Sequence, residues 1–332
     1  MALENGKITN LMKSEIIPLA GDASSRKFYR FKLNNKSQII VLATKQKYKN
    51  LIAYSAINKF LISHNILAPK LYKKNFRKGI VVIEDFGDFS FHKILSKKKN
   101  QITNYKKLID LLIKIQKIKP KLKIKSFGHK SHKIGKYSKK YLHQESDLFF
   151  EWYLPLFFTN KKIRKIKKKI RKILSNLYDE LNFSNSCFVH RDYHSQNLIK
   201  VGNRIGVIDS QDALIGNPAY DLASLIDDVR IKTSFKLKKK LFNYYLKKAP
   251  VKYKSEFKNF LEDFNILSVQ RSLKIIGIFS RLFKRDGKKQ YLSFIPYTWK
   301  LLEARMRSEI FSELQKLLNR NIPKKIRNKI IK

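Results

Sequence analysis

The chain has 332 residues, of which 43% are hydrophobic, and a formal net charge of +48. This length suffices for two lobes with real cores, and no apolar run approaches the roughly 18 residues of a membrane span, so we expect none. The single cysteine, Cys187, excludes an intrachain disulfide, and the first residues contain no apolar signal region, which favours a cytoplasmic protein. Lys is spread along the whole chain, as is typical of an AT-rich genome, so we expect incidental attraction of polyanions and no specific nucleic-acid partner.

The first predicted feature is a strand, a small-residue turn and a second strand. Residues 16–30 read IIPLAGDASSRKFYR, and the turn contains or adjoins Gly21, Ser24, Ser25 and Arg26. Small residues let backbone N–H groups approach phosphates closely, and hydroxyl and guanidinium groups add further donors. Such a turn by itself is typical of an ordinary hairpin. Its position ahead of the motifs described below favours a phosphate-covering loop.

A second β-rich run, QIIVLAT at residues 38–44, is followed by Lys45. In protein kinases this strand carries a Lys that contacts the phosphates and pairs with a Glu on the next helix. Here no Asp or Glu lies between Asp22 and Glu84, so that pair cannot form. We expect Lys45 or Arg26 to serve the phosphates instead, unless metal and backbone alone meet the charge of the nucleotide.

The next elements are a helix over residues 51–65 and a buried strand, GIVVIE, at residues 79–84. That strand runs directly into the sequence DFGD. A kinase-like chain crosses between its lobes at such a point, and its backbone groups bind adenine there. We therefore predict adenine contacts at Glu84, Asp85 and Phe86.

The middle of the chain is less specific. An amphipathic helix is predicted over residues 102–118, and His129 and His132 in the polar loop beyond it are interpreted as incidental rather than as a metal pair. Residues 141–158 are apolar and aromatic with a few acids, which is equally typical of a sugar site and of a lobe interface. The helix predicted over residues 161–181 has an apolar stripe, and nine basic residues in its first part predict a solvated face, with an RNA or membrane patch as the alternative.

The stretch FVHRDYHSQNLIKVGNRIGVIDSQDA, at residues 188–213, begins a region in which the charge balance is reversed. From Asp192 to Asp228 there are six Asp and only two basic residues. HRDYHSQN has the intact H-R-D-x-x-x-x-N spacing of a kinase catalytic loop. Phosphoryl transfer needs a carboxylate for the acceptor hydroxyl, and an amide oxygen with a second carboxylate for Mg²⁺. We therefore predict Asp192 as the catalytic base and Asn197 and Asp209 as the metal ligands.

The segment after Asp209 is too short to be the activation segment of a protein kinase, which argues against a protein substrate. NPAYDLA, at residues 217–223, predicts the start of a helix, with Asp221 in the first turn, where a carboxylate suits the helix dipole. Helical patterns and loops alternate over residues 235–318. The basic sequence PKKIRNKIIK at residues 323–332 predicts a frayed tail.

These motifs together resemble a known family. HRDYHSQN, IDSQDA and NPAYDLASL are similar to the aminoglycoside phosphotransferase and choline kinase branch of the kinase-like fold. AGDASSRKFYR, IEDFGD and QRSLKIIGIFSRLFKRDGKKQYL resemble the bacterial kinases that phosphorylate N-acetylmuramate and N-acetylglucosamine at C1. The resemblance runs from about Pro18 to Glu303. It implies that Asp221 supports the catalytic loop, and the resembled subfamily also tends to lack the strand lysine.

We therefore expect an α+β, two-lobed protein-kinase-like fold. An N-terminal nucleotide-binding lobe with a small antiparallel sheet would span residues 10–85, a mostly helical catalytic and substrate lobe residues 86–318, and a basic tail residues 319–332. ATP and Mg²⁺ would bind in the cleft, and the protein would act as a monomer.

The resemblance also implies the acceptor: an N-acetylated amino sugar phosphorylated at its anomeric hydroxyl, in peptidoglycan recycling. The polar residues predicted near this sugar are Glu145, Gln211, Asp212 and Arg271. Within the enzyme class, the alternative is a kinase for choline, homoserine or another small hydroxyl compound. Outside it, the alternatives are a basic nucleic-acid-binding protein and a catalytically inactive kinase-like scaffold.

Overall fold

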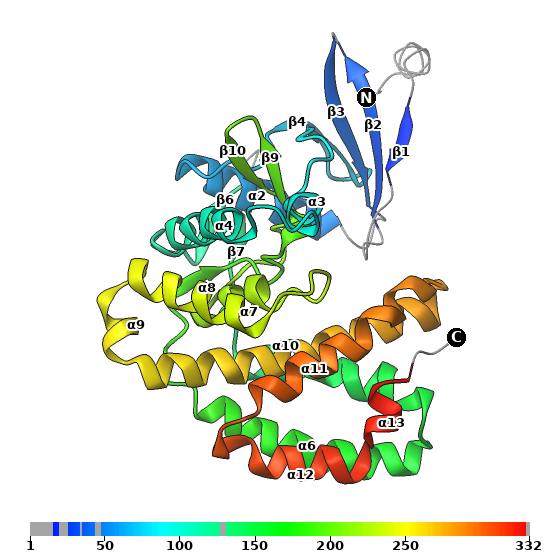
Figure 1. Cartoon of the computed structure of the whole chain (residues 1–332). Coiled ribbons are helices and arrows are strands. Elements are labelled where there is room, and N and C mark those ends of the chain that lie inside the picture. The colour runs from blue at the N-terminus through cyan, green and yellow to red at the C-terminus, as the bar shows by residue number, and fades with distance from the viewer. Residues whose placement is uncertain (1–15, 20–25, 34, 44–47, 127–130, 330–332) are drawn as a thin grey trace. The chain divides into compact units, whose positions relative to one another are not determined.

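The computed structural model describes residues 16–19, 26–33, 35–43, 48–126 and 131–329, and Figure 1 follows the chain through them. The chain forms two compact units, each assembled from separate stretches of sequence. The first unit comprises residues 1–94, 121–134 and 196–213, and the second comprises residues 95–120, 135–195 and 214–332. The catalytic loop predicted from the sequence therefore passes from the second unit to the first between Ser195 and Gln196. The lobe boundaries expected from the sequence remain a prediction.

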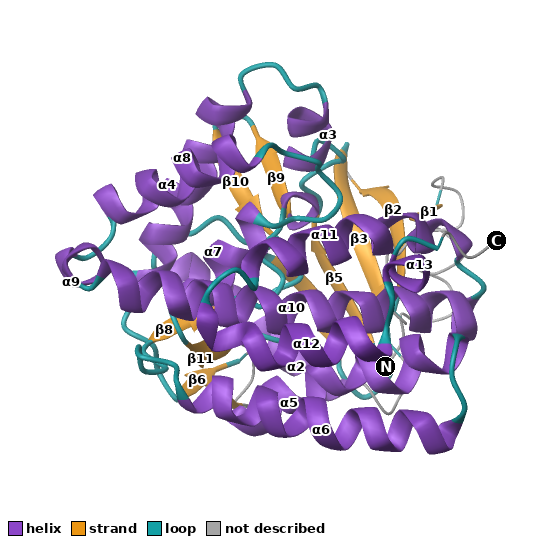
Figure 2. Cartoon of the chain, turned by 60° about the horizontal axis from the view of Figure 1, so that its bottom comes forward, coloured by secondary structure: helices purple, strands orange, loops and turns teal. Residues whose placement is uncertain are grey.

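The first unit contains a five-stranded antiparallel sheet with the strand order β1-β2-β3-β5-β4. Its strands are β1 (Ile17–Leu19), β2 (Lys27–Leu33), β3 (Lys36–Leu42), β4 (Leu71–Asn75) and β5 (Ile80–Glu84). Figure 2 shows β2, β3 and β5 side by side. The apolar side chains of the central strands pack with helix α2 (Tyr48–Ser63) into a core that includes Val41, Leu51, Tyr54, Val81 and Ile83.

The turn that leads into β5 requires glycine. Gly79 has φ +69°, and a Cβ at this position would lie 2.1 Å from the carbonyl oxygen of Ala43. The Ala43 N–H in turn donates to the Gly79 carbonyl oxygen at 2.8 Å. A larger residue would therefore separate the start of β5 from the end of β3.

Two small ribbons complete the first unit. One is β6 (Lys123–Lys125) with β7 (Ser131–Lys133), and the other is β9 (Leu198–Val201) with β10 (Arg204–Val207). The β9–β10 ribbon is fixed on both edges, because the Val207 N–H donates to the Leu67 carbonyl at 2.8 Å and the Lys200 N–H donates to the Phe89 carbonyl at 2.9 Å. Helix α3 (Phe91–Ser96) follows that second attachment.

The second unit is mostly helical, and the helix α10 (Phe257–Asp286) lies against several of the others. A short antiparallel pair of strands, β8 (Cys187–Val189) and β11 (Leu214–Gly216), precedes and follows the catalytic segment. The other α-helices are α4 (Gln101–Gln116), α5 (Lys139–Leu148), α6 (Asn160–Asp179), α7 (Ala219–Ile226), α8 (Phe235–Lys248), α9 (Val251–Ser255), α11 (Ile295–Arg305), α12 (Ser312–Asn321) and α13 (Lys324–Arg327). Shorter helical turns are η2 (Phe149–Tyr153), η3 (Leu154–Leu156), η4 (Ser195–Asn197), η5 (Lys289–Phe294) and η6 (Glu309–Phe311).

Close packing of α10 on the end of α5 depends on one glycine. A Cβ on Gly277 would lie 2.3 Å from the backbone carbonyl carbon of Leu148. With glycine there, α10 packs along both α5 and the π-helical turn η2. This contact fixes the part of α10 that carries the site residues described below.

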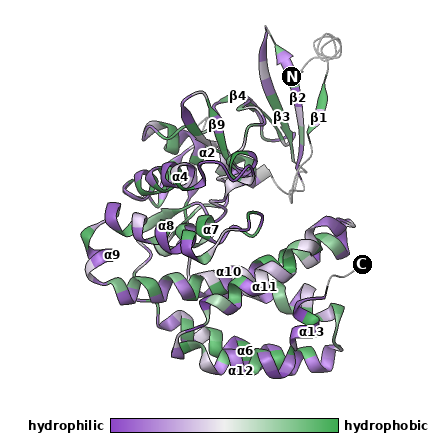
Figure 3. Cartoon of the chain, in the orientation of Figure 1, coloured by the Kyte–Doolittle hydropathy of each residue, from purple (hydrophilic) through white to green (hydrophobic). Residues whose placement is uncertain are grey.

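Helix α6 confirms the amphipathic pattern predicted over residues 161–181. Its apolar stripe is buried, and most of its basic side chains are exposed. In Figure 3, hydrophobic and hydrophilic colours likewise alternate along α12, as expected for a helix with one buried face. None of the helices in the described ranges combines the length and apolarity needed to cross a bilayer.

The frayed tail predicted after Pro323 is wrong for the residues that the structure describes. Helix α13 forms there, and the Arg327 side chain is buried, at 2% exposure. Its guanidinium donates to Glu303 Oε1, to Asn319 Oδ1 and to the Ile322 carbonyl. From the sequence, Arg327 was expected in a loose basic tail. In the structure it anchors α13, because its partners come from the preceding helices and the end of α12.

Candidate active site

Asn197 and Asp209 lie at the same end of the β9–β10 ribbon, in the first unit. Asn197 directly precedes β9, and Asp209 follows β10 by two residues. Val207 pairs with Leu198 across the ribbon, and the Ile208 N–H donates to the Asn197 carbonyl oxygen at 3.0 Å. The antiparallel pairing therefore brings together an amide and a carboxylate that are separated along the chain.

The backbone of Asp209 is left-handed, with φ 63°. A non-glycine residue keeps this conformation only where the surrounding contacts hold it. The buried Ser210 provides one contact by donating its hydroxyl hydrogen bond to Asn58 Oδ1 at 2.8 Å. Arg26 provides another, since it donates to Asp209 Oδ1 at 2.6 Å and to Gln211 Oε1 at 3.1 Å. The turn after β10 thus holds the carboxylate in a defined place.

These residues fit a magnesium ion bound together with a nucleotide. Mg²⁺ prefers oxygen ligands and usually keeps waters and substrate phosphates, so one or two protein oxygens suffice. Asn197 offers an amide oxygen and Asp209 a carboxylate that is 39% exposed. The described part of the chain contains no group of three or more His, Cys, Asp or Glu that could hold a metal ion. A metal at this place would therefore need ligands from the nucleotide.

Asp192 belongs to the second unit, where the loop after β8 is fixed by Asp221. The N–H groups of His190 and Arg191 donate to the two carboxylate oxygens of Asp221 at 2.6 and 3.0 Å. Asp221 lies in the first turn of α7 and is fully buried. Its two hydrogen bonds hold the backbone directly before Asp192, as expected for a residue that supports the catalytic loop.

Arg191 is the second residue with an unusual backbone in the predicted site. Its φ of 73° is left-handed, and it is clamped from several sides besides Asp221. Its carbonyl oxygen accepts a hydrogen bond from Arg271 Nη1 at 3.1 Å, and its guanidinium donates to Glu145 Oε1. Strained backbone persists where neighbours over-determine it, and this is common at functional sites.

Glu145 is the centre of a buried polar network. Its carboxylate accepts hydrogen bonds from Arg191, from Tyr137, from Gln270 Nε2 at 3.1 Å and from Tyr220 at 3.4 Å. It also forms an ion pair with Lys274 Nζ at 3.0 Å. Burial alone would raise the pKa of Glu145, but the charges of Lys274 and then Arg191 outweigh it and lower this pKa to about 2.

Two cationic side chains of helix α10 lie close to the Asp192 carboxylate. Lys274 Nζ lies 3.7 Å and Arg271 Nη1 3.8 Å from Asp192 Oδ1. The two cationic side chains are 7% and 4% exposed, whereas the Asp192 side chain is 37% exposed. Burial would raise the pKa of Asp192, but Lys274 first and Arg271 second hold it well below its usual range. Asp192 is therefore an anion across the physiological pH range.

The structure distributes the predicted site residues as follows. Gly21, Ser24, Ser25 and Lys45 lie outside the described residues. Arg26, Asn197, Asp209 and Gln211 come together in the first unit, where Asp212 is exposed and accepts a hydrogen bond from Gln211 Nε2. Glu145, Asp192 and Arg271 come together in the second unit.

The segment after β5, which is predicted to contact adenine, is held by hydrogen bonds of its own side chains. Asp85 accepts hydrogen bonds from Arg30, from Ser37 and from the Gly87 N–H, and Glu84 Oε2 accepts from the Lys70 N–H. Phe86 is buried, and a Cβ on Gly206 would lie 2.6 Å from its ring. These side chains already have partners within the unit. Adenine contacts at this segment would therefore have to come from backbone groups.

Lys274 is a residue of the candidate site that the sequence did not reveal. It lies on α10, three residues after Arg271 and four after Gln270, so all three project toward Glu145 and Asp192. The available signal was helical spacing, because positions three and four apart share a helix face. Because Lys is abundant along the whole chain, nothing in the sequence distinguished Lys274 from other lysines on helices.

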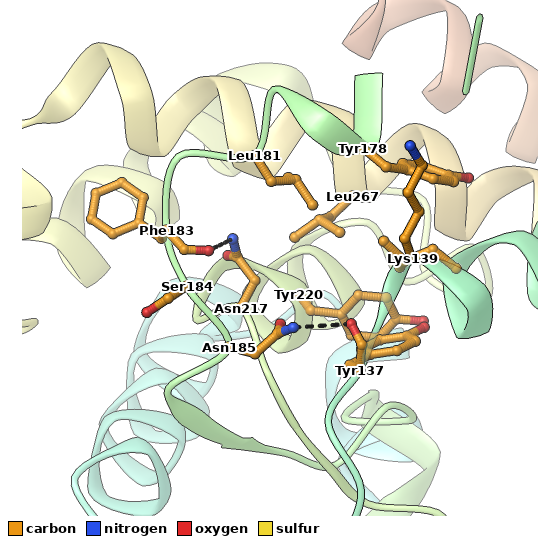
Figure 4. Close-up of a pocket in the computed structure, with 11 residues that line it drawn as sticks. Tyr137, Lys139, Tyr178, Leu181, Phe183, Ser184, Asn185, Asn217, Tyr220 and Leu267 are labelled. Atoms are coloured by element: carbon orange, nitrogen blue, oxygen red, sulfur yellow. Dashed lines mark hydrogen bonds between the residues drawn. The ribbon is translucent and has the colours of Figure 1, made fainter. Parts of the chain in front are cut away.

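A cavity of about 220 Å³ in the second unit adjoins this network. Figure 4 shows Tyr137 and Tyr220 together at one end of it, with Asn185, Asn217 and Phe183 along the wall. Both tyrosines also donate to Glu145. Asn217 is already bonded to Phe183 and Asp263, and Asn185 to Tyr137, so much of the polar lining serves the protein itself.

Known proteins resemble this chain in sequence. A family model described as "Phosphotransferase enzyme family" matches residues 15–254. The N-acetylmuramate/N-acetylglucosamine kinase of Pseudomonas aeruginosa is 27% identical over 309 residues, which cover 92% of this chain and 88% of that protein. The protein of the same name from Caulobacter vibrioides is 28% identical over 276 residues, with 82% of this chain and 75% of that protein covered.

Among solved structures, choline kinase LicA from Streptococcus pneumoniae is similar with a TM-score of 0.61 and 16% identity, covering 90% of this chain and 97% of that one. At this identity the likeness concerns the fold. Together with the antiparallel sheet and the many helices, it confirms the predicted α+β kinase-like fold.

Proposed function

The chain belongs to the phosphotransferase enzyme family, and on that premise we propose that it transfers the γ-phosphoryl group of ATP to the anomeric C1 hydroxyl of N-acetylmuramate or N-acetylglucosamine. The observation that carries the chemistry is Asp192, a partly exposed carboxylate kept ionised by two buried cations within a loop of kinase spacing. The acceptor rests on the two relatives of that name, which match most of this chain.

In this mechanism Asp192 orients the acceptor hydroxyl. The anionic carboxylate accepts the hydrogen bond of the hydroxyl and directs its oxygen toward the γ-phosphorus. The proton passes to Asp192 as the new P–O bond forms, the bond from the γ-phosphorus to the β–γ bridging oxygen breaks, and ADP leaves. The C1 hydroxyl of a reducing sugar is more acidic than an ordinary alcohol. A carboxylate with a low pKa therefore suffices, since it must position the hydroxyl more than it must remove a tightly held proton.

Asn197 and Asp209 would hold Mg²⁺, which when bound neutralises the charge that builds up on the transferring phosphates. Arg26 already bonds Asp209, so its guanidinium is within reach of phosphates placed there. We assign the rest of the nucleotide contacts to the loop residues Gly21, Ser24 and Ser25, to Lys45, and to backbone groups of residues 84–86. These assignments remain predictions.

Recognition of the sugar must come from groups away from C1. An acetamido group presents one hydrogen-bond donor and one acceptor, and a site built to pair both leaves its own polar groups unpaired when an unsubstituted sugar binds. Gln211, Asp212 and Arg271 remain the proposed polar contacts, and Glu145 acts through the residues that it holds. Because both sugars are components of peptidoglycan, we place the reaction in cytoplasmic cell-wall recycling by a monomeric enzyme.

The test is product analysis with a panel of acceptors. Purified protein, ATP and Mg²⁺ are incubated with N-acetylmuramate, N-acetylglucosamine, glucose, choline and homoserine, and the position of the phosphate is assigned by ³¹P NMR. We expect an alkali-stable, acid-labile sugar 1-phosphate, with glucose at least about tenfold poorer in kcat/KM because a buried hydrogen-bond pair is lost. A phosphate at C6, or preference for choline or homoserine, would overturn the acceptor assignment while leaving the phosphotransferase reaction in place.

A further inference from the structure

Helix α10 presents two buried cations to one oxygen of the catalytic carboxylate. Arg271 and Lys274 both approach Asp192 Oδ1, at 3.8 and 3.7 Å. Arg271 also donates to the Arg191 carbonyl, so it has a role in holding the loop backbone. Lys274 has only side-chain partners among the contacts described, namely Asp192, Glu145 and the Tyr220 hydroxyl. Its function can therefore be separated from that of the loop.

The position of Lys274 is itself set by Glu145. Lys274 Nζ is closer to Glu145, at 3.0 Å, than to Asp192, at 3.7 Å. Glu145 cannot move to follow another partner, because Arg191, Tyr137 and Gln270 also bind it. The ammonium is thus fixed between one carboxylate that is buried and one that is partly exposed.

A merely structural ion pair would not need this arrangement. Glu145 by itself would satisfy a buried lysine, and the additional approach of Lys274 Nζ to Asp192 Oδ1 at 3.7 Å goes beyond that pair. The charged and titratable groups that act on Asp192 are Lys274 and Arg271 from α10 and His194 and Arg191 from its own loop. Burial lowers the pKa of His194 to about 3, so this imidazole is neutral near pH 7. Lys274 has the largest favourable effect among them on the ionised form.

We propose that Lys274 is a positioning residue for phosphoryl transfer: held in place by Glu145, its ammonium fixes Asp192 Oδ1 and keeps the carboxylate in the anionic form that orients the acceptor hydroxyl. This inference rests on the proposed function. It gives Glu145 an indirect role, because Glu145 sets the position of Lys274 without contacting the substrate. The catalytic loop itself has no Lys or Arg after Asp192, so α10 supplies the cation that the loop lacks.

The experiment compares Lys274→Met with Lys274→Arg and with a matched control, Lys238→Met. Lys238 is also buried, at 2% exposure, and is paired with a buried carboxylate, Asp227, at 3.1 Å. Substituting Lys238 also removes a buried, paired lysine, but not one of the two cations that lie close to Asp192. We expect Lys274→Met to lower kcat about 10²-fold with the KM for ATP unchanged, the pattern of a lost contribution to the chemical step.

The pH profile is the readout that a structural role would not move. The pKa of Asp192 is lowered by Lys274, so removing this lysine raises that pKa, and activity that needs the anion is then lost at a higher pH. In Lys274→Met the acid limb of kcat/KM should move to higher pH. Lys274→Arg should restore most of kcat and the original limb, and Lys238→Met should keep the parent limb.

A double variant, Glu145→Gln with Lys274→Met, separates folding from catalysis. It removes the carboxylate that Lys274→Met leaves buried with one cation, Arg191, in place of two, so Tm is measured beside kcat, and kcat should stay low. If Lys274→Met keeps the parent kcat and acid limb, or if the double variant recovers kcat together with Tm, the proposal is overturned. The comparison is run with whichever acceptor the panel identifies, so failure of the amino-sugar assignment is visible in the wild type and is a separate result.

Discussion

The two predicted catalytic carboxylates have almost the same exposure and opposite surroundings. The Asp192 side chain is 37% and the Asp209 side chain 39% exposed. Asp192 faces two buried cations on helix α10 at 3.7 to 3.8 Å, whereas Asp209 bonds directly to one cation, Arg26, at 2.6 Å. The difference shows that environment, rather than exposure, distinguishes the two roles.

The two arrangements suit different tasks. A carboxylate that orients a hydroxyl must stay anionic and fixed, and rigid buried cations provide that. A carboxylate that binds a metal must exchange its partner, and a direct contact to one arginine can be replaced when Mg²⁺ and nucleotide arrive. The left-handed backbone at Arg191 and at Asp209 is common to both and marks where the chain is held against its own preference.

The largest effect of a substitution is expected at Asp209. We expect Asp209→Ala to remove the metal dependence of ATP binding and all detectable turnover, because the charge of the phosphates is no longer neutralised. Calorimetric titration of ATP with and without Mg²⁺ measures this. Asp212→Ala, which removes a neighbouring exposed carboxylate, is the control and should keep the metal dependence of ATP binding. Equal Mg²⁺ dependence in the parent and in Asp209→Ala would contradict the assignment of Asp209.

A smaller and more selective effect is expected at Asp192. Asp192→Asn keeps the shape of the side chain but cannot attract the hydroxyl proton, so kcat should fall by at least about 10²-fold while ATP affinity changes little. Single-turnover kinetics and ATP titration separate the two quantities. Asp179→Asn, at a carboxylate on α6 that is 63% exposed, is the control and should behave as the parent. Turnover of Asp192→Asn near the parent rate would remove the catalytic assignment.

The sequence predicts what is local and misses what depends on packing. Asp192 and Asn197 could be identified because the loop that carries them has a fixed spacing, and the strands and amphipathic helices could be identified from their periodicity. Lys274 could not, since its role arises only when α10 packs beside the loop. For the same reason Arg26 could be predicted to meet phosphates but not to bond Asp209, and Arg327 was read as part of a loose tail.

Burial is the second property that the sequence does not provide. Glu145 stands in an aromatic stretch that fits a sugar site, yet its carboxylate is used by Arg191, Lys274 and Tyr137 inside the protein. A single sequence gives no measure of how many donors surround an acid. The tertiary contacts show how many donors surround Glu145. They favour a role in holding neighbouring side chains rather than in contacting the substrate.

The smallest effect is expected at Arg30, which has one buried and one exposed acidic partner. Arg30 donates to Asp85 at 2.6 and 3.1 Å and to Asp88 at 2.7 and 2.9 Å, but the Asp85 side chain is 3% and the Asp88 side chain 62% exposed. We expect Asp88→Asn to lower the free energy of unfolding by about 0 to 1 kcal/mol, the range for an exposed pair. Asp85→Asn should cost about 1.5 to 3 kcal/mol, because hydrogen bonds to a buried charged carboxylate are weakened or lost.

The pH dependence of this small effect has a definite sign. The hydrogen bonds from Arg30 lower the pKa of Asp88, so its contribution is present above the pKa of Asp88 in the unfolded chain and is lost as the pH falls through the folded value. The parent and Asp88→Asn should therefore differ at pH 7 and converge in strong acid, as urea unfolding at both pH values measures. If Asp88→Asn proved as costly as Asp85→Asn at pH 7, the burial of the carboxylate would not decide the strength of the two ion pairs of Arg30.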